Sequence, residues 1–363
     1  MNEYKLSEKF LQALGGDGEF NQDSTRAGFG RGLVTAGENN ENVVGLCADL
    51  TESTQMHKFA EKFPERFVQV GIAEQNLVTV ASGMAHVGKI PFAANYAAFN
   101  PGRNWEQIRT TICINDVPVK IIGTHAGVNV GPDGETHQML EDIALMRALP
   151  NMVVIAPGDS VEAEKVAAAC AKDSRPNYIR LARDKSPVFS DPDSPFEIGR
   201  AYVLREGSDV TICATGTMTA QALIASANLG KQGISAEIIH VPTIKPLDEQ
   251  TILDSARKTG RIITVEEHQT SGGFGGAVAE LLMEKYSDMS EAKRHAGKLF
   301  RLSRRLSLPP NSKSLQFKRI GMNDQFGQSG SPAELLKYYG LTAENITKTA
   351  QNILQKVPSA DKI

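Results

Sequence analysis

The feature that most constrains this fold is the alternation of short, β-branched segments with longer helical patterns. The strand-like segments of the first half are 43–47, 66–70, 118–124, 152–157 and 178–182. Each is bounded by polar, Gly or Pro residues, as is typical of buried strands. The helical patterns between them are 74–86, 103–114 and 161–171. Strands that alternate with helices predict a parallel sheet covered on both faces.

A second α/β series follows a linker at 184–197, which holds three prolines and no periodicity. Its predicted strands are 209–216, 236–242, 261–266 and 317–321. Its predicted helices are 218–232, 248–258, 274–286, 332–339 and 343–354. The length of 363 residues suits about two domains. We therefore expect an α/β protein with two consecutive parallel-sheet domains, at 20–184 and 198–345.

One charged block interrupts the second series. Residues 287–319 hold nine Lys or Arg against two Asp or Glu. We expect a solvated basic insertion at about 287–316, outside the active site, with a short helix near 292–306. A docking surface for an acidic partner and a binder of anionic membrane surfaces are the alternatives. The net charge of −3 argues against a nucleic-acid partner.

Several classes of protein are disfavoured by simple features. No run approaches ~18 apolar residues, and the mixed-charge N-terminus lacks the apolar core of a secretory signal. The four cysteines share no C-x-x-C spacing and are too few for a disulfide framework. We expect a reduced, cytoplasmic protein with buried thiols and no membrane partner.

Three segments place glycine beside ionisable or aromatic residues at the ends of predicted strands, where sites in open parallel sheets form. They are 70–76, 95–105 and 124–138. In the first, Glu74 is a carboxyl group in an apolar setting that can share a proton. Its alternative is a Glu in the first helical turn, favoured by the helix dipole. In the second, Tyr96 and Phe99 can stack on a flat ring or belong to the core.

The third segment is a loop with two histidines, two acids and three glycines. The spacing of His125 and His137 does not specify a metal site and no cysteine is near, so we expect no metal ligands here. An organic substrate or cofactor fits better, although each histidine alone can be a structural hydrogen bonder. Elsewhere, GGFGG at 272–276 is similar to a phosphate-binding loop. Close helix packing is the favoured interpretation.

Together with GQSGSPAELLKYYGLTAENI at 327–346, these motifs resemble transketolase, and most closely the C-terminal half of a transketolase encoded as two chains. The family's Gly-Asp-Gly motif for diphosphate and Mg²⁺ follows a strand. GDG at 16–18, with Asn42 25 residues after Asp17, follows a helical pattern instead. We interpret these glycines as the end of a helix. The resemblance thus places the Mg²⁺ ligands on a partner chain.

The resemblance implies a thiamine-diphosphate enzyme that transfers a two-carbon ketol unit between sugar phosphates, a reaction of the pentose phosphate pathway. It implies an N-terminal transketolase subunit as partner, in a hetero-oligomer that is a dimer of heterodimers. Three alternatives stay open: a deoxyxylulose-phosphate synthase, a 2-oxo-acid dehydrogenase β chain and a non-catalytic binding protein. The synthase typically has His-Gly where this chain has Ser329-Gly330.

The resemblance also assigns roles to individual residues. The catalytic residues are Glu74, Asp133 and His137, with Glu74 contacting the aminopyrimidine ring of the cofactor. The residues expected near the cofactor are Ile72, Asp49, Tyr96 and Phe99. The residues expected to bind sugar phosphate are Arg26, Ser53, His125 and Arg183. Arg103 lies close to the ring site but is offset by one residue from the family pattern.

Overall fold

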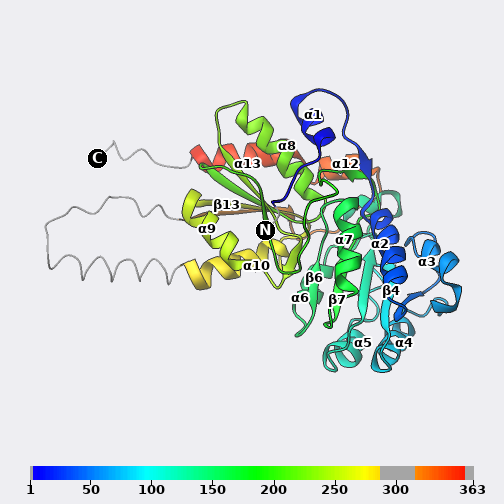
Figure 1. Cartoon of the computed structure of the whole chain (residues 1–363). Helices are drawn as coiled ribbons and strands as arrows, with labels where there is room; N and C mark the ends of the chain where they lie inside the picture. Colours follow the sequence, from blue (N-terminus) through cyan, green and yellow to red (C-terminus); the bar gives the residue numbers. More distant parts are fainter. Residues whose placement is uncertain (1–2, 287–314, 356–363) are drawn as a thin grey trace, which may run out of the picture.

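The computed structural model describes residues 3–286 and 315–355 (Figure 1). Almost all of the expected basic insertion, including its short helix near 292–306, lies outside the described residues. The chain forms two large sheets joined side by side, each covered by helices. The expected α/β architecture with two successive sheets is confirmed.

The first sheet has seven strands in the order β12-β6-β7-β5-β4-β2-β3. Its strands are β2 (Val43–Cys47), β3 (Phe67–Gln69), β4 (Ile90–Tyr96), β5 (Lys120–Thr124), β6 (Val153–Ile155), β7 (Asn177–Arg180) and β12 (Thr243–Lys245). All neighbouring pairs are parallel except β12 with β6. Because β12 comes from beyond the linker, this sheet draws on both halves of the sequence.

The second sheet has five strands in the order β14-β13-β10-β11-β9. They are β9 (Tyr202–Arg205), β10 (Val210–Ala214), β11 (Ala236–His240), β13 (Arg261–Gln269) and β14 (Gln316–Met322). Only the β9–β11 pair is antiparallel. A short ribbon of β1 (Gln22–Asp23) and β8 (Ser186–Pro187) ties the N-terminal segment to the linker.

The helices pack on both faces of each sheet. Those of the first half are α1 (Glu8–Gly15), α2 (Thr25–Asn39), α3 (His57–Lys62), α4 (Glu74–His86), α5 (Trp105–Gln107), α6 (Asp142–Arg147) and α7 (Ser160–Cys170). Shorter 3₁₀ turns lie at Pro64–Arg66 and Val128–Asp133, and π-helical turns at Ile108–Cys113 and Leu282–Tyr286. Those of the second half are α8 (Met218–Gly230), α9 (Glu249–Thr259), α10 (Phe274–Leu281), α12 (Pro332–Tyr338) and α13 (Ala343–Gln355).

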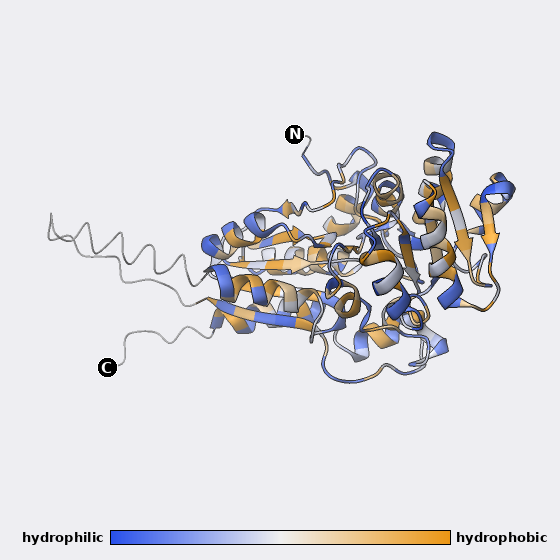
Figure 2. Ribbon diagram, turned by 90° about the horizontal axis from the view of Figure 1, so that it is seen from below, coloured by the Kyte–Doolittle hydropathy of each residue, from blue (hydrophilic) through white to orange (hydrophobic). Residues whose placement is uncertain are grey.

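Strand alternation divides the core into layers. In β2, Val44 and Leu46 join α4 in one cluster, whereas Val43 faces α2, α3 and α7 in another. The first of these clusters continues without a break into α9 and α10 of the second half. A third cluster joins α8 and α13 to the other face of the second sheet, and includes Phe10 of α1. Figure 2 shows the hydrophobic strands inside and polar residues along the outer helices.

Helix α2 was not expected, because TRAGFGRG is rich in glycine and has poor helix propensity. The structure supplies the reason for its glycines. A Cβ on Gly28 would lie 1.9 Å from the carbonyl oxygen of Ser160, and one on Gly32 would lie 2.3 Å from that of Glu164. Glycine therefore lets α2 pack directly on the backbone of α7, and this contact stabilises the helix more than its propensity opposes it.

Other expectations need adjustment at the edges of elements. The helix expected at 103–114 begins only at Trp105 and turns π-helical at Ile108. The linker at 184–197 is partly buried, because Asp159 accepts hydrogen bonds from the backbone of Phe189 and Ser190. The N-terminal glycines do end a helix, with Gly16 left-handed at φ 103° after α1.

Candidate active site

The sequence-predicted site residues gather at one edge of the first sheet, beyond the carboxyl ends of its parallel strands. They lie at or after the ends of β2, β3, β4, β5 and β7, and Arg26 lies in the first turn of helix α2, next to Arg183 in the segment after β7. Most of them form one connected cluster, which we define as the strand-end cluster: Glu74, Tyr96, Phe99, Arg103, His125, His137, Arg26, Arg183 and Ser53.

Glu74 is positioned by the turn after β3. Gly71 adopts a left-handed φ of 71°, and the chain then enters α4 with Glu74 as its first residue. The Glu74 residue is 7% exposed, and Oε1 accepts a hydrogen bond from Arg103 Nη1 at 3.0 Å. Its backbone carbonyl accepts one from Asn104 Nδ2 at 2.8 Å. Both neighbours come from the loop after β4, which therefore holds the carboxylate against the end of that strand.

The aromatic pair lies beside this carboxylate. Tyr96 and Phe99 have ring centroids 5.9 Å apart and planes inclined by 18°. The Arg103 guanidinium carbon lies 4.1 Å from the Phe99 centroid, so Arg103 bridges the ring and Glu74. Near-parallel rings next to a buried carboxylate suit a flat heteroaromatic ligand with a ring nitrogen.

His125 continues the stack from the other side of Tyr96, with ring centroids 3.7 Å apart. It follows β5 with a left-handed φ of 56°, a conformation that a histidine adopts only where its surroundings enforce it. Burial, helped by the charges of Arg26 and Arg183, lowers the pKa of His125 to about 2. His125 is therefore a neutral imidazole at physiological pH.

Two arginines complete the far end of the cluster. Arg26 donates from Nε to the carbonyl of Arg183 at 3.0 Å and from Nη1 to the carbonyl of Ser53 at 2.6 Å. Arg183 donates from Nη1 to the carbonyl of Val130 at 2.6 Å. Neither guanidinium pairs with a carboxylate in the part of the chain that the structure describes. Burial, followed by the charge of Arg183, lowers the pKa of Arg26. Two like charges held together in this way favour an anionic ligand.

The loop after β5 brings His137 over the aromatic pair. Its ring is edge-on to Phe99 at 5.5 Å and to Tyr96 at 6.4 Å. The loop is anchored by Gln138, whose Nε2 donates to the carbonyl of Gln328 at 3.0 Å. The loop at 124–138 and the segment at 327–346, which both carry motifs of the family resemblance, are therefore in direct contact through residues 190 positions apart.

Three predicted site residues border the cluster without joining it. In the described structure, the side chains of Asp49, Ile72 and Asp133 make no hydrogen bond or ring contact with the cluster. Asp49 has a left-handed φ of 61°, and its N–H donates to Gln69 Oε1. Ile72 is 76% exposed, and Asp133 is exposed at the end of the Val128–Asp133 turn. Their roles stay predictions.

Sequence reasoning underrated Arg103 and missed Asn104. Arg103 follows Phe99 by four residues in a turn, which brings its guanidinium back over the ring. Asn104 also donates to Asn100 Oδ1 at 3.1 Å and so fixes the turn that carries both residues. The signal for Asn104 is FNPGRN, in which Asn100 and Asn104 are four residues apart, as side chains on one face of a helical turn are.

Other candidate features of the chain have structural roles. The GGFGG segment packs closely, because Cβ atoms on Gly273 or Gly275 would lie 2.1 Å or 2.9 Å from the carboxylate oxygens of Glu266. That carboxylate already accepts the first N–H groups of α10, from Phe274 and Gly275. The expectation of close helix packing is confirmed.

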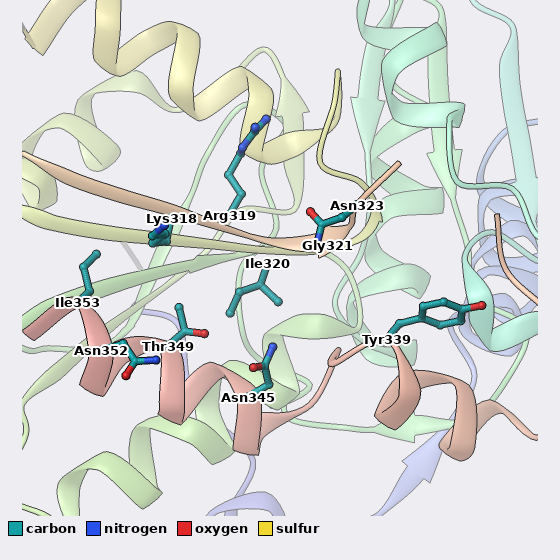
Figure 3. A pocket seen from close by; sticks show the side chains of 10 residues that line it. All are labelled: Lys318, Arg319, Ile320, Gly321, Asn323, Tyr339, Asn345, Thr349, Asn352 and Ile353. Carbon is teal, nitrogen blue, oxygen red and sulfur yellow. The ribbon is translucent and has the colours of Figure 1, made fainter. Parts of the chain in front are cut away.

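A cavity of about 330 Å³ lies between β14 and α13, away from the strand-end cluster. Figure 3 shows Arg319 and Ile320 on opposite faces of β14, with Asn345, Thr349 and Asn352 on the facing helix.

Among the described residues, no group of three or more His, Cys, Asp or Glu side chains is placed to hold a metal ion. No helix in the described ranges is long and apolar enough to cross a membrane. All four cysteines are free and buried.

Comparison with known proteins gives consistent matches across the chain. The family model "Transketolase, pyrimidine binding domain" matches residues 22–188, and "Transketolase, C-terminal domain" matches residues 199–298. A protein of Methanocaldococcus jannaschii described as a "transketolase C-terminal section" is 43% identical, over 91% of this chain and 96% of that protein. A solved structure titled "Split gene transketolase, inactive beta4 tetramer" is 43% identical, with a TM-score of 0.79 over 91% of this chain and 98% of that one.

Relatives with other named activities are also similar. The "6-deoxy-6-sulfo-D-fructose transketolase subunit SqwH" of Clostridium sp. strain MSTE9 is 34% identical over 89% of this chain and 92% of that protein. The "1-deoxy-D-xylulose-5-phosphate synthase" of Desulforudis audaxviator is 35% identical over 90% of this chain. The chain spans only 48% of that synthase.

Proposed function

The chain belongs to the transketolase family, and we propose that it is the C-terminal subunit of a two-chain enzyme that transfers a two-carbon ketol unit between sugar phosphates. The observation that carries this proposal is the continuity of the strand-end cluster. A buried carboxylate and stacked aromatic rings at one end lead directly to two arginines at the other, neither of which pairs with a carboxylate among the described residues. A heteroaromatic cofactor ring and a phosphorylated sugar need these two environments side by side.

The carboxylate end fits the aminopyrimidine ring of thiamine diphosphate. Glu74 would accept a hydrogen bond from, or share a proton with, a ring nitrogen, and Phe99 and Tyr96 would pack on the ring. Ile72 and Asp49 are proposed to lie at the border of the same site. When bound, the cofactor supplies the carbon nucleophile that cleaves and carries the ketol unit. The chain's own residues orient the ring and move protons.

Arg103 contacts both the carboxylate and the aromatic ring at the proposed cofactor end of the site. Its side chain is 53% exposed and pairs with the Glu74 carboxylate across the face of Phe99. A pyrimidine ring that reaches Glu74 has to share this carboxylate with Arg103 or displace the guanidinium into solvent. The exposure of Arg103 gives its guanidinium a path into solvent, and a hydrogen bond from the ring would replace the one that the Glu74 carboxylate, 8% exposed, loses.

The substrate would lie between the aromatic rings and the arginines. His137 is proposed to face the donor carbonyl, where it can polarise the oxygen or pass a proton. Asp133 is proposed to accept a hydrogen bond from the neighbouring ketose hydroxyl. At the far end, Arg26 and Arg183 supply charge to the phosphate, while Ser53 and the neutral His125 supply uncharged donors.

The proposal includes a second chain. The diphosphate of the cofactor and its Mg²⁺ are proposed to bind to an N-terminal transketolase subunit, in a dimer of heterodimers. Two similarities support this: the solved relative with the same architecture is a split-gene transketolase, and the chain covers 96% of a relative described as a C-terminal section.

Deoxyxylulose-phosphate synthase is the second candidate, favoured by relatives that are 35% and 36% identical. Ser329, where the synthase typically has His, is the discriminating position. It packs on the loop after β5, since a Cβ on Gly134 would lie 2.6 Å from Ser329 Oγ. A residue that touches this loop can change which donor the site accepts.

The test is to co-express the chain with an N-terminal transketolase subunit and to purify the complex with thiamine diphosphate and Mg²⁺. Ketol transfer from xylulose 5-phosphate to ribose 5-phosphate is expected. A parallel assay supplies pyruvate and glyceraldehyde 3-phosphate and measures CO₂ release. CO₂ release without ketol transfer would favour the synthase. A complex that forms and shows neither activity would contradict both candidates.

A further inference from the structure

One buried carboxylate of the second half contacts the loop that holds the proposed phosphate site. Glu267 lies near the end of β13 and is 4% exposed. Its Oε1 accepts from the backbone N–H of Asn129 at 2.7 Å and from Asn129 Nδ2 at 3.0 Å. Its Oε2 lies 2.8 Å from the same Nδ2. One carboxylate from the second sheet therefore fixes both the backbone and the side chain of a residue in the loop after β5.

Asn129 also contacts the proposed phosphate site directly. Its Oδ1 accepts from the backbone N–H of Arg183 at 3.0 Å and from that of Asp184 at 3.4 Å. The next residue in the loop, Val130, offers its carbonyl to the Arg183 guanidinium at 2.6 Å. The loop thus holds Arg183 by its backbone and by its side chain.

Arg183 in turn holds Arg26, whose Nε donates to the Arg183 carbonyl at 3.0 Å. Arg26 also donates to the Ser53 carbonyl. A single chain of hydrogen bonds therefore links Glu267 to three of the four residues proposed to bind phosphate.

The close approach of the loop to Glu267 is built into the backbone. Gly127 has a φ of 92°, and a Cβ there would lie 2.3 Å from Glu267 Oε1. Only glycine combines that conformation with that contact. The Glu267 carbonyl is also fixed, since it accepts from Arg180 Nη2 at 2.7 Å. Glu267 is thus held at two points, its carboxylate by Asn129 and its backbone carbonyl by Arg180.

We propose that Glu267 is a positioning residue for phosphate recognition, and that it acts through Asn129 to place Arg183 and Arg26 without touching substrate. This inference rests on the assignment of Arg26, Ser53, His125 and Arg183 to the sugar phosphate. It gives the second half of the chain a role in substrate affinity as well as in packing.

The Glu267→Gln variant tests the proposal with little change in volume. The introduced amide keeps one oxygen for the Asn129 N–H, but its NH₂ group meets Asn129 Nδ2, so two donors face each other. Affinity for ribose 5-phosphate is expected to fall about tenfold, the ratio that corresponds to one buried hydrogen bond. Affinity for ribose should not change, because ribose does not use the arginines.

Glu266→Gln is the matched control. Glu266 is the preceding residue of β13, is equally buried and also accepts backbone N–H groups, but its partners are Phe274 and Gly275 of α10. Among the described residues, no hydrogen bond joins Glu266 to Asn129. Any loss that reflects general destabilisation of β13 should appear in both variants, whereas loss of positioning should appear only in Glu267→Gln.

A double variant provides a rescue. Combining Glu267→Gln with Asn129→Asp reverses donor and acceptor across the contact: the new amide donates, and the new carboxylate accepts. That carboxylate still has an oxygen for the Arg183 N–H. Recovery of phosphate affinity in this double variant is expected, and it would assign the effect to the contact between the two side chains and not to residue 267 alone.

The measurements are calorimetric titration of the full chain with ribose 5-phosphate and with ribose, and KM and kcat of the complex with its partner subunit. The expected result is a rise in KM for the phosphorylated acceptor in Glu267→Gln, with kcat nearly unchanged, little effect in Glu266→Gln and recovery in the double variant. Equal effects of the two single variants, or none in Glu267→Gln, would overturn the proposal. If the wild-type protein binds both sugars equally, the phosphate assignment itself is wrong.

Discussion

The charge state of His125 makes a prediction about stability that requires no partner subunit. Burial and the nearby charges of Arg26, Arg183 and His137 lower its pKa to about 2 in the folded chain. In the unfolded chain a histidine titrates near ~6.5. Below that pH, the unfolded state binds a proton that the folded state does not bind, so the free energy of unfolding decreases as the pH falls. Replacing His125 by a residue that does not titrate removes this contribution.

The size of the effect follows from the same two values. Between pH 7 and pH 5 the folded-state imidazole stays neutral, while its unfolded counterpart becomes almost fully charged. Integrating the linkage over this interval gives about 2 kcal/mol of stability lost through His125 alone. The interval lies well above a pKa of about 2, so this figure depends little on the exact folded-state value.

The assay is urea denaturation of the full-length chain and of His125→Gln at pH 7 and pH 5. All other titrating groups contribute to both proteins, so their effects cancel in the comparison. The free energy of unfolding should fall about 2 kcal/mol less in the variant than in the wild type. At pH 7 and above, the free energies of unfolding of the two proteins should change with pH in parallel. An identical loss on acidification in both proteins would refute the neutral, buried His125 on which this reasoning depends.

Three further predictions concern the proposed reaction. Glu74→Gln should nearly abolish ketol transfer in the complex while the circular dichroism spectrum is unchanged, because an amide cannot share the proton of the pyrimidine ring; near-normal turnover would remove Glu74 from catalysis. The isolated chain should bind thiamine diphosphate only weakly by calorimetry, and tight Mg²⁺-dependent binding without a partner would contradict the two-chain proposal. Arg183→Ala and His125→Ala should raise KM for phosphorylated sugars more than they lower kcat. An equal penalty with unphosphorylated sugars would exclude them from the phosphate site.

Much of this architecture was predictable because its signals are local. The strands alternate with helices in the sequence, and the limits of α4 at Glu74 and His86 follow from a glycine turn and a clear apolar face. Site residues directly follow strands, and parallel strands end at the same edge of a sheet, so their proximity could be expected. Tyr96, Phe99, His125 and His137 were found in this way and do lie together.

What the sequence could not supply depends on contacts between distant segments. Helix α2 is stabilised by the backbone of α7, which its glycines allow it to approach. Strand β12 gains its hydrogen bonds from β6, a strand of the other half. Glu267 and Asn129 are 138 residues apart, and nothing in either segment marks the other as its partner. The lowered pKa of His125 likewise depends on its burial and on arginines from two other elements.

These long-range contacts have a common consequence for the proposed site. The first sheet includes β12, one hydrophobic cluster runs from α4 into α9 and α10, and the loop after β5 is held by Glu267. The two halves are therefore joined by backbone pairing, by apolar packing and by a buried polar contact. The polar contact leads to the arginine end of the strand-end cluster, through Asn129 to Arg183. On the proposed assignment of Arg183 to the phosphate, a change at the boundary between the halves that spares the core still alters substrate recognition, and Glu267 is the residue at which packing and recognition can be separated by experiment.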